Sequence, residues 1–106
     1  MSYCITIREH GCTVVDESDW LMLPAEAGTM VKELCGVYPS QWNGKSAAEM
    51  IPVLDAAMKL AQASSAELRQ HEGVSFTVET VFDFLMRFHR FCIDHAEYGA
   101  VEVDTG

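Results

Sequence analysis

Basic residues are scarce in this chain, and their scarcity argues against two classes of partner. Seven Lys and Arg residues stand against sixteen Asp and Glu residues, and the formal net charge is -9. Nucleic acids and anionic membranes are bound by clustered Lys and Arg side chains, and the few bases here are scattered. Direct nucleic-acid binding and membrane binding are therefore not expected. The acidity favours a basic protein partner, although an ordinary solvated acidic surface explains it more simply.

Cysteine pairs and long apolar runs are also missing. The four cysteines, Cys4, Cys12, Cys35 and Cys92, form no C-x-x-C pair and match no zinc-finger or zinc-ribbon spacing. No apolar run is long enough to span a membrane. The opening MSYCITIREHG alternates apolar and polar residues and lacks the apolar core of a signal peptide. We therefore expect a cytoplasmic protein with reduced thiols, no metal and no cofactor.

The patterns that are present predict one small domain, residues 1–106, with strands at both ends. The chain has 106 residues and 49 % hydrophobic content, which fits a single core. Alternation over residues 3–8 predicts a strand, and His10-Gly11 predicts a turn into a second strand at CTVV. The acidic DESDW, residues 16–20, is expected to be a turn or loop. Val101 and Val103 alternate with acids, which predicts a last strand beside the hairpin.

Three helices are predicted between these strands. The first follows Pro24 and closes at Gly36, a residue suited to helix C-termini. The second covers residues 46–70 and opens with the capping-box spacing of Ser46 and Glu49. The third covers residues 77–95. The predicted fold class is α+β: a small antiparallel sheet, made of the N-terminal hairpin and the C-terminal strand, packed against about three helices.

The stretch FHRFCIDH, residues 88–95, is the most plausible place for chemistry. On a helical wheel, Cys92 falls in the middle of the apolar arc, and His89 and His95 flank it about 120° apart. Metal-binding histidines on one helix normally stand four residues apart, and a buried thiol is inert. We therefore expect a packed helix with no metal site and no catalytic site. An enzyme that uses Cys92 and His89 is the third of our functional hypotheses.

Aromatic residues supply the candidate interface. The charged residues of the last helix occupy one sector of about 80°, so this helix is unusually apolar for a surface helix. Its apolar ridges belong either to the core or to an interface. Aromatics in or beside loops either fold back or anchor a partner. The candidate interface residues are Trp20, Tyr38, Trp42, Phe84 and Phe91.

The segment NGKS suggests an alternative, a nucleotide site at Gly44, Lys45 and Ser46. It resembles the end of a phosphate-binding loop, with Tyr38 or Trp42 available to stack on a base. The full motif needs a glycine where this chain has Pro39. Helix capping by Ser46 explains the segment better.

The chain also resembles small uncharacterised proteins of phage and prophage genomes. The likeness rests on MSYCITI, on NGKSAAEMIPVLDAAMKLAQ and on a final helix that leads into a Val-rich end. The resemblance implies the bacterial cytosol and binding to host proteins. The leading hypothesis is therefore a non-enzymatic acidic protein that binds, and by binding inhibits, a host protein, with self-association left open. A small-molecule or nucleotide-sequestering protein is the alternative.

Overall fold

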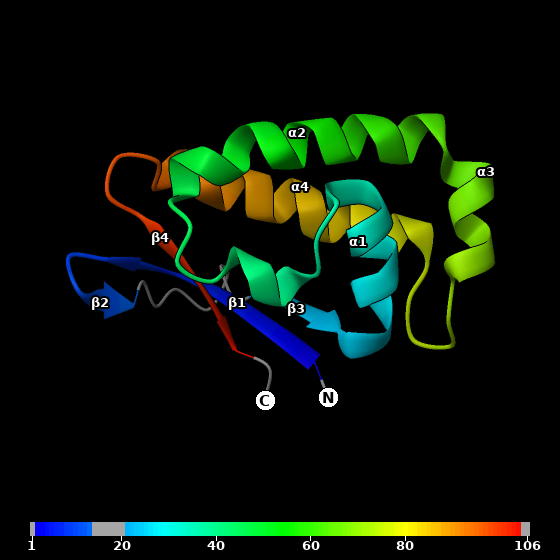
Figure 1. Ribbon diagram of the computed structural model, residues 1–106, viewed down its shortest axis with the longest axis horizontal. Helices are drawn as coiled ribbons and strands as arrows, with labels where there is room; N and C mark the ends of the chain where they lie inside the picture. The colour runs from blue at the N-terminus through cyan, green and yellow to red at the C-terminus, as the bar shows by residue number, and fades with distance from the viewer. Residues whose placement is uncertain (1, 14–20, 105–106) are drawn as a thin grey trace.

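The computed structural model describes residues 2–13 and 21–104, and it has the α+β fold that the sequence predicts (Figure 1). The described strands are β1 (Ser2–Glu9), β2 (Cys12–Thr13), β3 (Leu21–Pro24) and β4 (Ala100–Asp104). The described α-helices are α1 (Gly28–Cys35), α2 (Ala47–Ala63), α3 (Ser65–Leu68) and α4 (Val78–Asp94). Short 3-10 helices occur at η2 (Ala25–Ala27), η3 (Pro39–Trp42) and η4 (Arg69–His71).

The sheet is built around β1, which is the longest strand. It pairs antiparallel with β2 and β3 along one edge and with β4 along the other. The predicted hairpin is confirmed: Glu9 pairs with Cys12 across a turn in which His10 and Gly11 both have positive φ angles, 51° and 80°. Two positive φ angles match the turn to the right-handed twist of the strands. The predicted place of the last strand beside the hairpin is also confirmed.

The strand β3 was missed by the sequence prediction. Only Leu21 and Leu23 point inward in it, with Met22 exposed between them. Three alternating residues before a proline are too few for periodicity to show. The segment DESDW, predicted to be a turn or loop, lies outside the described residues.

The helix boundaries follow the predicted caps. The Ser46 hydroxyl accepts from the Glu49 amide at 3.1 Å, and the Glu49 carboxylate accepts from the Ser46 amide at 2.9 Å. The Thr77 hydroxyl accepts from the Thr80 amide at 3.2 Å. Gly36 ends α1 with φ 85°, a left-handed conformation that glycine adopts without strain.

The second predicted helix is shorter than expected. It ends at Ala63 rather than near residue 70, because Ser64 leaves helical geometry with φ -118° and ψ 21°. The chain then restarts as α3, which turns away from the axis of α2 (Figure 1). Serine side chains compete with the helix for backbone hydrogen bonds, and a Ser64-Ser65 pair is a weak point. The break lets Leu68 enter the core.

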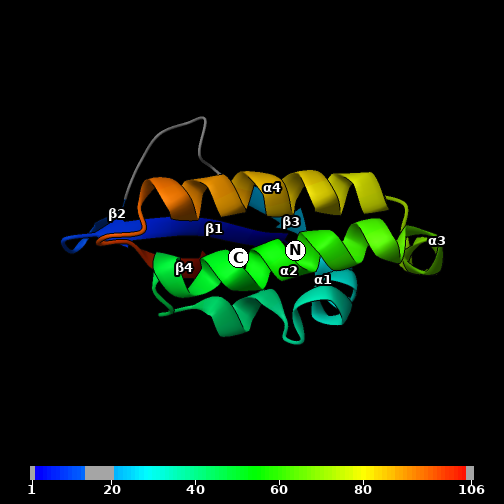
Figure 2. The same cartoon turned by 90° about the horizontal axis from the view of Figure 1, so that it is seen from above.

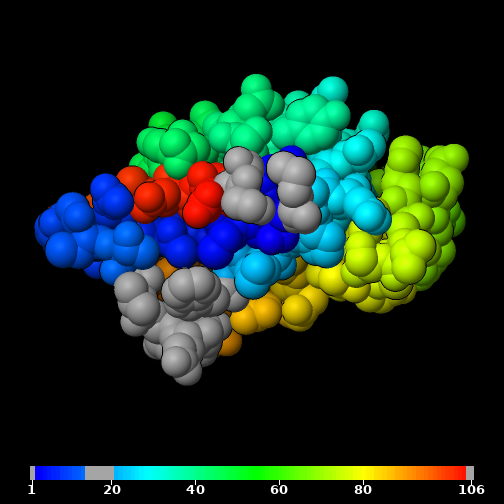
Figure 3. All heavy atoms as spheres, turned by 90° about the horizontal axis from the view of Figure 1, so that it is seen from below, coloured from blue at the N-terminus to red at the C-terminus, as the bar shows by residue number. Residues whose placement is uncertain are grey.

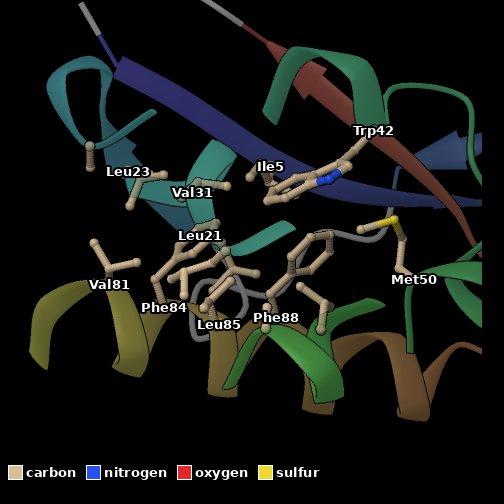
Figure 4. Close-up of a cluster of buried hydrophobic side chains, with 14 of the residues drawn as sticks. Ile5, Leu21, Leu23, Val31, Trp42, Met50, Val81, Phe84, Leu85 and Phe88 are labelled. Atoms are coloured by element: carbon tan, nitrogen blue, oxygen red, sulfur yellow. The ribbon is translucent and has the colours of Figure 1, made fainter. Parts of the chain in front are cut away.

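The helices α2 and α4 run side by side in opposite directions over one face of the sheet (Figures 1 and 2). Inward residues of the sheet, such as Ile5 and Leu23, meet Phe84 and Phe88 of α4 beneath them (Figure 4). On the other side of the sheet, atoms of β1, β3 and β4 reach the surface (Figure 3). There Met22 is 61 % exposed. The core therefore lies between the sheet and the helical layer.

Candidate functional site

The structure does not bring the residues of FHRFCIDH together as a reactive cluster. Cys92 is fully buried in the core, and burial raises the pKa of its thiol to about 12. A thiol with so high a pKa is protonated at neutral pH and is a poor nucleophile. His95 points to Glu9 of β1 rather than to Cys92. Among the residues that the structure describes, no three His, Cys, Asp or Glu side chains are arranged to hold a metal ion.

Most of the predicted interface aromatics turn out to be core residues. Trp42 is 1 % exposed, Phe84 is 5 % exposed and Phe91 is 4 % exposed. The prediction that these three residues form an interface is therefore wrong. For Trp42 the reason is the short helix η3, which folds the loop back so that the Trp42 ring lies 5.4 Å from the Phe88 ring. Phe84 and Phe91 are buried because α4 packs against α2 and the sheet.

Tyr38 is the predicted interface residue that stays at the surface. It is 39 % exposed, and the Lys32 ammonium lies 4.9 Å from the centre of its ring. At an exposed position such a cation–π contact contributes about 0.5–1 kcal/mol of interaction free energy, which favours this orientation of the ring. Trp20 lies outside the described residues.

The segment of residues 43–46 covers the outer edge of β4 instead of forming a phosphate-binding loop. The Gly44 amide donates to the Val101 carbonyl at 2.9 Å, and the Val101 amide donates to the Lys45 carbonyl at 2.7 Å. The amides of Lys45, Ser46 and Ala47 also have acceptors, and the Ser46 acceptor is a carboxylate. A phosphate would need free amides and would be repelled by Glu49. This geometry contradicts the proposed nucleotide site at Gly44, Lys45 and Ser46.

An apolar row on the solvent side of α2 was not anticipated from the sequence. We call the row the α2 outer face; it consists of Pro52, Val53, Ala56, Leu60 and Ala63, all of them exposed. Val53 is 36 % exposed and Leu60 is 43 % exposed. A surface helix normally turns charged side chains to solvent.

Charged groups are few on this helix. Within α2 they are Glu49, which is engaged in the capping box, and Asp55 and Lys59, which pair at 3.1 Å. A helical wheel of α2 could have shown this row, because α2 has more apolar residues than its buried side contains.

Comparison of the chain with protein-family models, with curated proteins and with solved structures finds no match. Of the helices in the described part of the chain, none has both the length and the apolar composition needed to cross a bilayer. The candidate site therefore rests on the geometry of this chain alone, and the α2 outer face is the surface that this geometry singles out.

Proposed function

We propose that the chain is a non-enzymatic protein-binding module that docks a partner on the α2 outer face. The observation that carries the proposal is the row of exposed apolar side chains, in which Leu60 and Val53 stand beside the small Ala56 and Ala63. Contiguous apolar surface of this kind typically marks an interaction site. Its burial by a partner would contribute roughly 25 cal/mol per Å².

The partner fitted by this surface is an amphipathic helix with basic residues beside its apolar face. Small side chains at Ala56 and Ala63 let a helix approach α2 closely, and Leu60 and Val53 give it ridges to pack against. The net charge of -9 attracts a basic partner over long range and accelerates the encounter. The same charge repels a second copy of the chain, so self-association is the weaker option.

The biological setting that we propose is the bacterial cytosol, with the chain acting as an accessory protein of a phage or mobile element. The resemblance of MSYCITI and NGKSAAEMIPVLDAAMKLAQ to small phage proteins supports this setting. The partner would then be a host protein, and occupation of its helix would inhibit it. The exposed Tyr38 is a further candidate contact.

The test compares two substitutions on the α2 outer face with one elsewhere. Leu60→Glu and Ala56→Arg place charge in the row, and Met22→Glu places a charge on the opposite side of the molecule, where Met22 is 61 % exposed. Proteins captured from a bacterial lysate are identified by mass spectrometry, and the purified candidate is then titrated by calorimetry. We expect the first two variants to weaken binding by about tenfold or more, which is about 1.4 kcal/mol, and Met22→Glu to leave it unchanged.

Circular dichroism melting confirms that each variant is folded before binding is compared. A partner that binds all three variants as tightly as the parent chain would place the interface elsewhere. Sedimentation equilibrium of the parent chain tests the other occupant: a dimer that Leu60→Glu dissociates would assign the α2 outer face to self-association instead of to a heterologous partner.

A further inference from the structure

A second association surface is indicated on α4, on the side of this helix that borders α2. Four side chains form it at spacings of four, three and four residues: Phe82, Met86, His89 and Ile93. Met86 is 47 % exposed, Ile93 is 50 % exposed, and Phe82 and His89 are half-buried beside them. We call this row the α4 seam. Its spacing is that of the narrow stripe along which two helices pack in a coiled coil.

The α4 seam belongs to the outer surface of the helical layer. On a helical wheel it lies between the buried arc of α4 and the charged sector. Phe82 lines a hollow together with residues of α2, which places the seam on the α2 side of the helix. Figure 2 looks at α2 and α4 from the side opposite the sheet, and no described element lies over the two helices there. The seam is therefore accessible to a partner along its length.

The hollow beside Phe82 is an acceptor for a protruding side chain. It has a volume of about 280 Å³ and lies where the end of α2 and the helix α3 meet the start of α4. Its apolar wall consists of Ala61, Val78 and Phe82. One aliphatic side chain of a partner would bury apolar surface in this hollow. The chain itself carries such a side chain, the half-exposed Ile93, at the other end of the seam.

We propose that two copies of the chain associate through the α4 seam, with their α4 helices antiparallel about a two-fold axis. The spacing of the seam reads the same in both directions, so Ile93 of one copy reaches the hollow beside Phe82 of the other. Met86 of each copy then packs against His89 of the other copy. Each contact occurs twice, as two-fold symmetry requires. This association is separate from partner docking on the α2 outer face, with which the α4 seam shares no residue.

Two charged residues beside the seam favour this orientation. Asp83 and Arg90 directly follow two seam residues, Phe82 and His89, and therefore flank the seam on the same side. In an antiparallel pair this flank lies along the same flank of the other copy, so Asp83 meets Arg90 at two places. A parallel pair would place like charges level with each other. The ion pairs found among the described residues include neither Asp83 nor Arg90, so both are available to a second copy.

The net charge of -9 opposes any association of two copies, and α4 offsets this repulsion locally. The helix carries three carboxylates and two guanidinium groups, which leaves a net charge of -1 on it. One of the carboxylates, that of Glu79, is already paired with Arg69 at 2.6 Å. We therefore expect a weak dimer that depends on protein concentration.

Sedimentation equilibrium of the parent chain, from low micromolar to millimolar concentration, tests for this dimer. We expect a reversible equilibrium between monomer and dimer. Met86→Glu should weaken it about tenfold or more, because this variant places a charge in the seam. The matched controls are Leu60→Glu on the α2 outer face and Met22→Glu on the outer face of the sheet, which should leave the equilibrium unchanged. Circular dichroism melting verifies that each variant is folded.

Charge reversals test the antiparallel orientation. Asp83→Arg brings two arginine side chains together at each contact and should weaken the dimer about tenfold or more. This variant makes the chain less acidic, so a general charge effect would instead strengthen the dimer. Arg90→Asp should weaken it to a similar extent. The double variant, Asp83→Arg with Arg90→Asp, restores opposite charges at both contacts and should dimerise like the parent chain.

A parent chain that stays monomeric over this concentration range would overturn the proposal. So would a dimer that tolerates Met86→Glu, or single charge reversals that the double variant does not rescue. A dimer that Leu60→Glu dissociates would also overturn it, because self-association would then use the α2 outer face instead of the α4 seam.

Discussion

The Nδ1 atom of His95 is hydrogen-bonded to the carboxylate of Glu9, so the end of α4 is joined to the end of β1. Both side chains are partly buried, 21 % and 28 % exposed. The rings of Phe91 and His95 meet edge to face, with their centres 5.0 Å apart. The ring centres of His10 and Tyr98 are 4.7 Å apart. One of the two histidines of FHRFCIDH thus connects the helical layer to the hairpin.

Removing the Glu9 carboxylate should destabilise the fold. A partly buried hydrogen bond of this kind contributes about 1–2 kcal/mol, so Glu9→Ala should lower the free energy of unfolding by that amount. Glu9→Gln keeps an acceptor oxygen for His95 Nδ1 and should cost less. Urea denaturation of Glu9→Ala, His95→Ala and the double variant measures the coupling between the two residues. Strictly additive losses would show that the bond contributes nothing to stability.

The parts of the fold that were predicted correctly from the sequence are those determined by residues close together in the chain. The turn at His10-Gly11, the capping box of Ser46 and Glu49, and the left-handed Gly36 each depend on residues close together in the chain. The break at Ser64 and the strand β3 depend on tertiary contacts. The Ser64-Ser65 pair weakens the helix locally but does not by itself end it, and the packing of Leu68 into the core favours the turn.

The candidate site was less predictable, for a related reason. Trp42 and Phe91 were assigned to an interface because sequence shows which residues are apolar but not which apolar surfaces face each other. The packing of α2 beside α4 decides this, and it buries the ridges of α4 while leaving Leu60 and Val53 exposed. The buried indole N–H of Trp42, which has no hydrogen-bond partner among the described residues, has no sequence signal, since it depends on which atoms surround the indole.

Cysteine reactivity should separate the four thiols by burial. Cys12 is exposed at the hairpin, whereas the pKa values of Cys35 and Cys92 are raised to about 12 by burial. Iodoacetamide added to the native protein at about pH 8 should alkylate Cys12 first and leave Cys35 and Cys92 almost untouched, because the thiolate is the reactive form. Peptide mass spectrometry measures each site. The unfolded chain in urea is the control, in which all four thiols should react alike. Alkylation of native Cys92 as fast as Cys12 would contradict its burial.

The ion pair of Arg69 and Glu79 gives a prediction for pH. The Arg69 guanidinium lies 2.6 Å from the Glu79 carboxylate, and this hydrogen bond lowers the pKa of Glu79 below its ordinary value. Because the folded pKa lies below the unfolded one, the pair stabilises the fold above the ordinary glutamate range. That stabilisation is lost as the pH falls through the lowered pKa. Both groups are exposed, so the effect on stability is small.

Carbon-13 NMR titration of the Glu79 carboxyl measures this pKa directly. In Arg69→Gln the midpoint should rise toward the ordinary glutamate value. Lys59→Gln is the control: it removes a different exposed pair, between Lys59 and Asp55 on α2, and should leave the Glu79 midpoint where it is. An unchanged midpoint in Arg69→Gln would mean that the pair does not persist in solution.

Adjacent alanines of α2 test which side of this helix faces the core. Ala57 is fully buried, whereas Ala56 belongs to the exposed α2 outer face. Ala57→Leu forces extra volume into a packed interior and should lower the free energy of unfolding by about 1–3 kcal/mol. Ala56→Leu points into solvent and keeps a good helix former, so its effect should stay within about 0.5 kcal/mol. Urea denaturation compares the two. Equal losses would mean that α2 is rotated from the orientation described, and the docking surface proposed on Leu60 and Val53 would then have to be assigned to other residues.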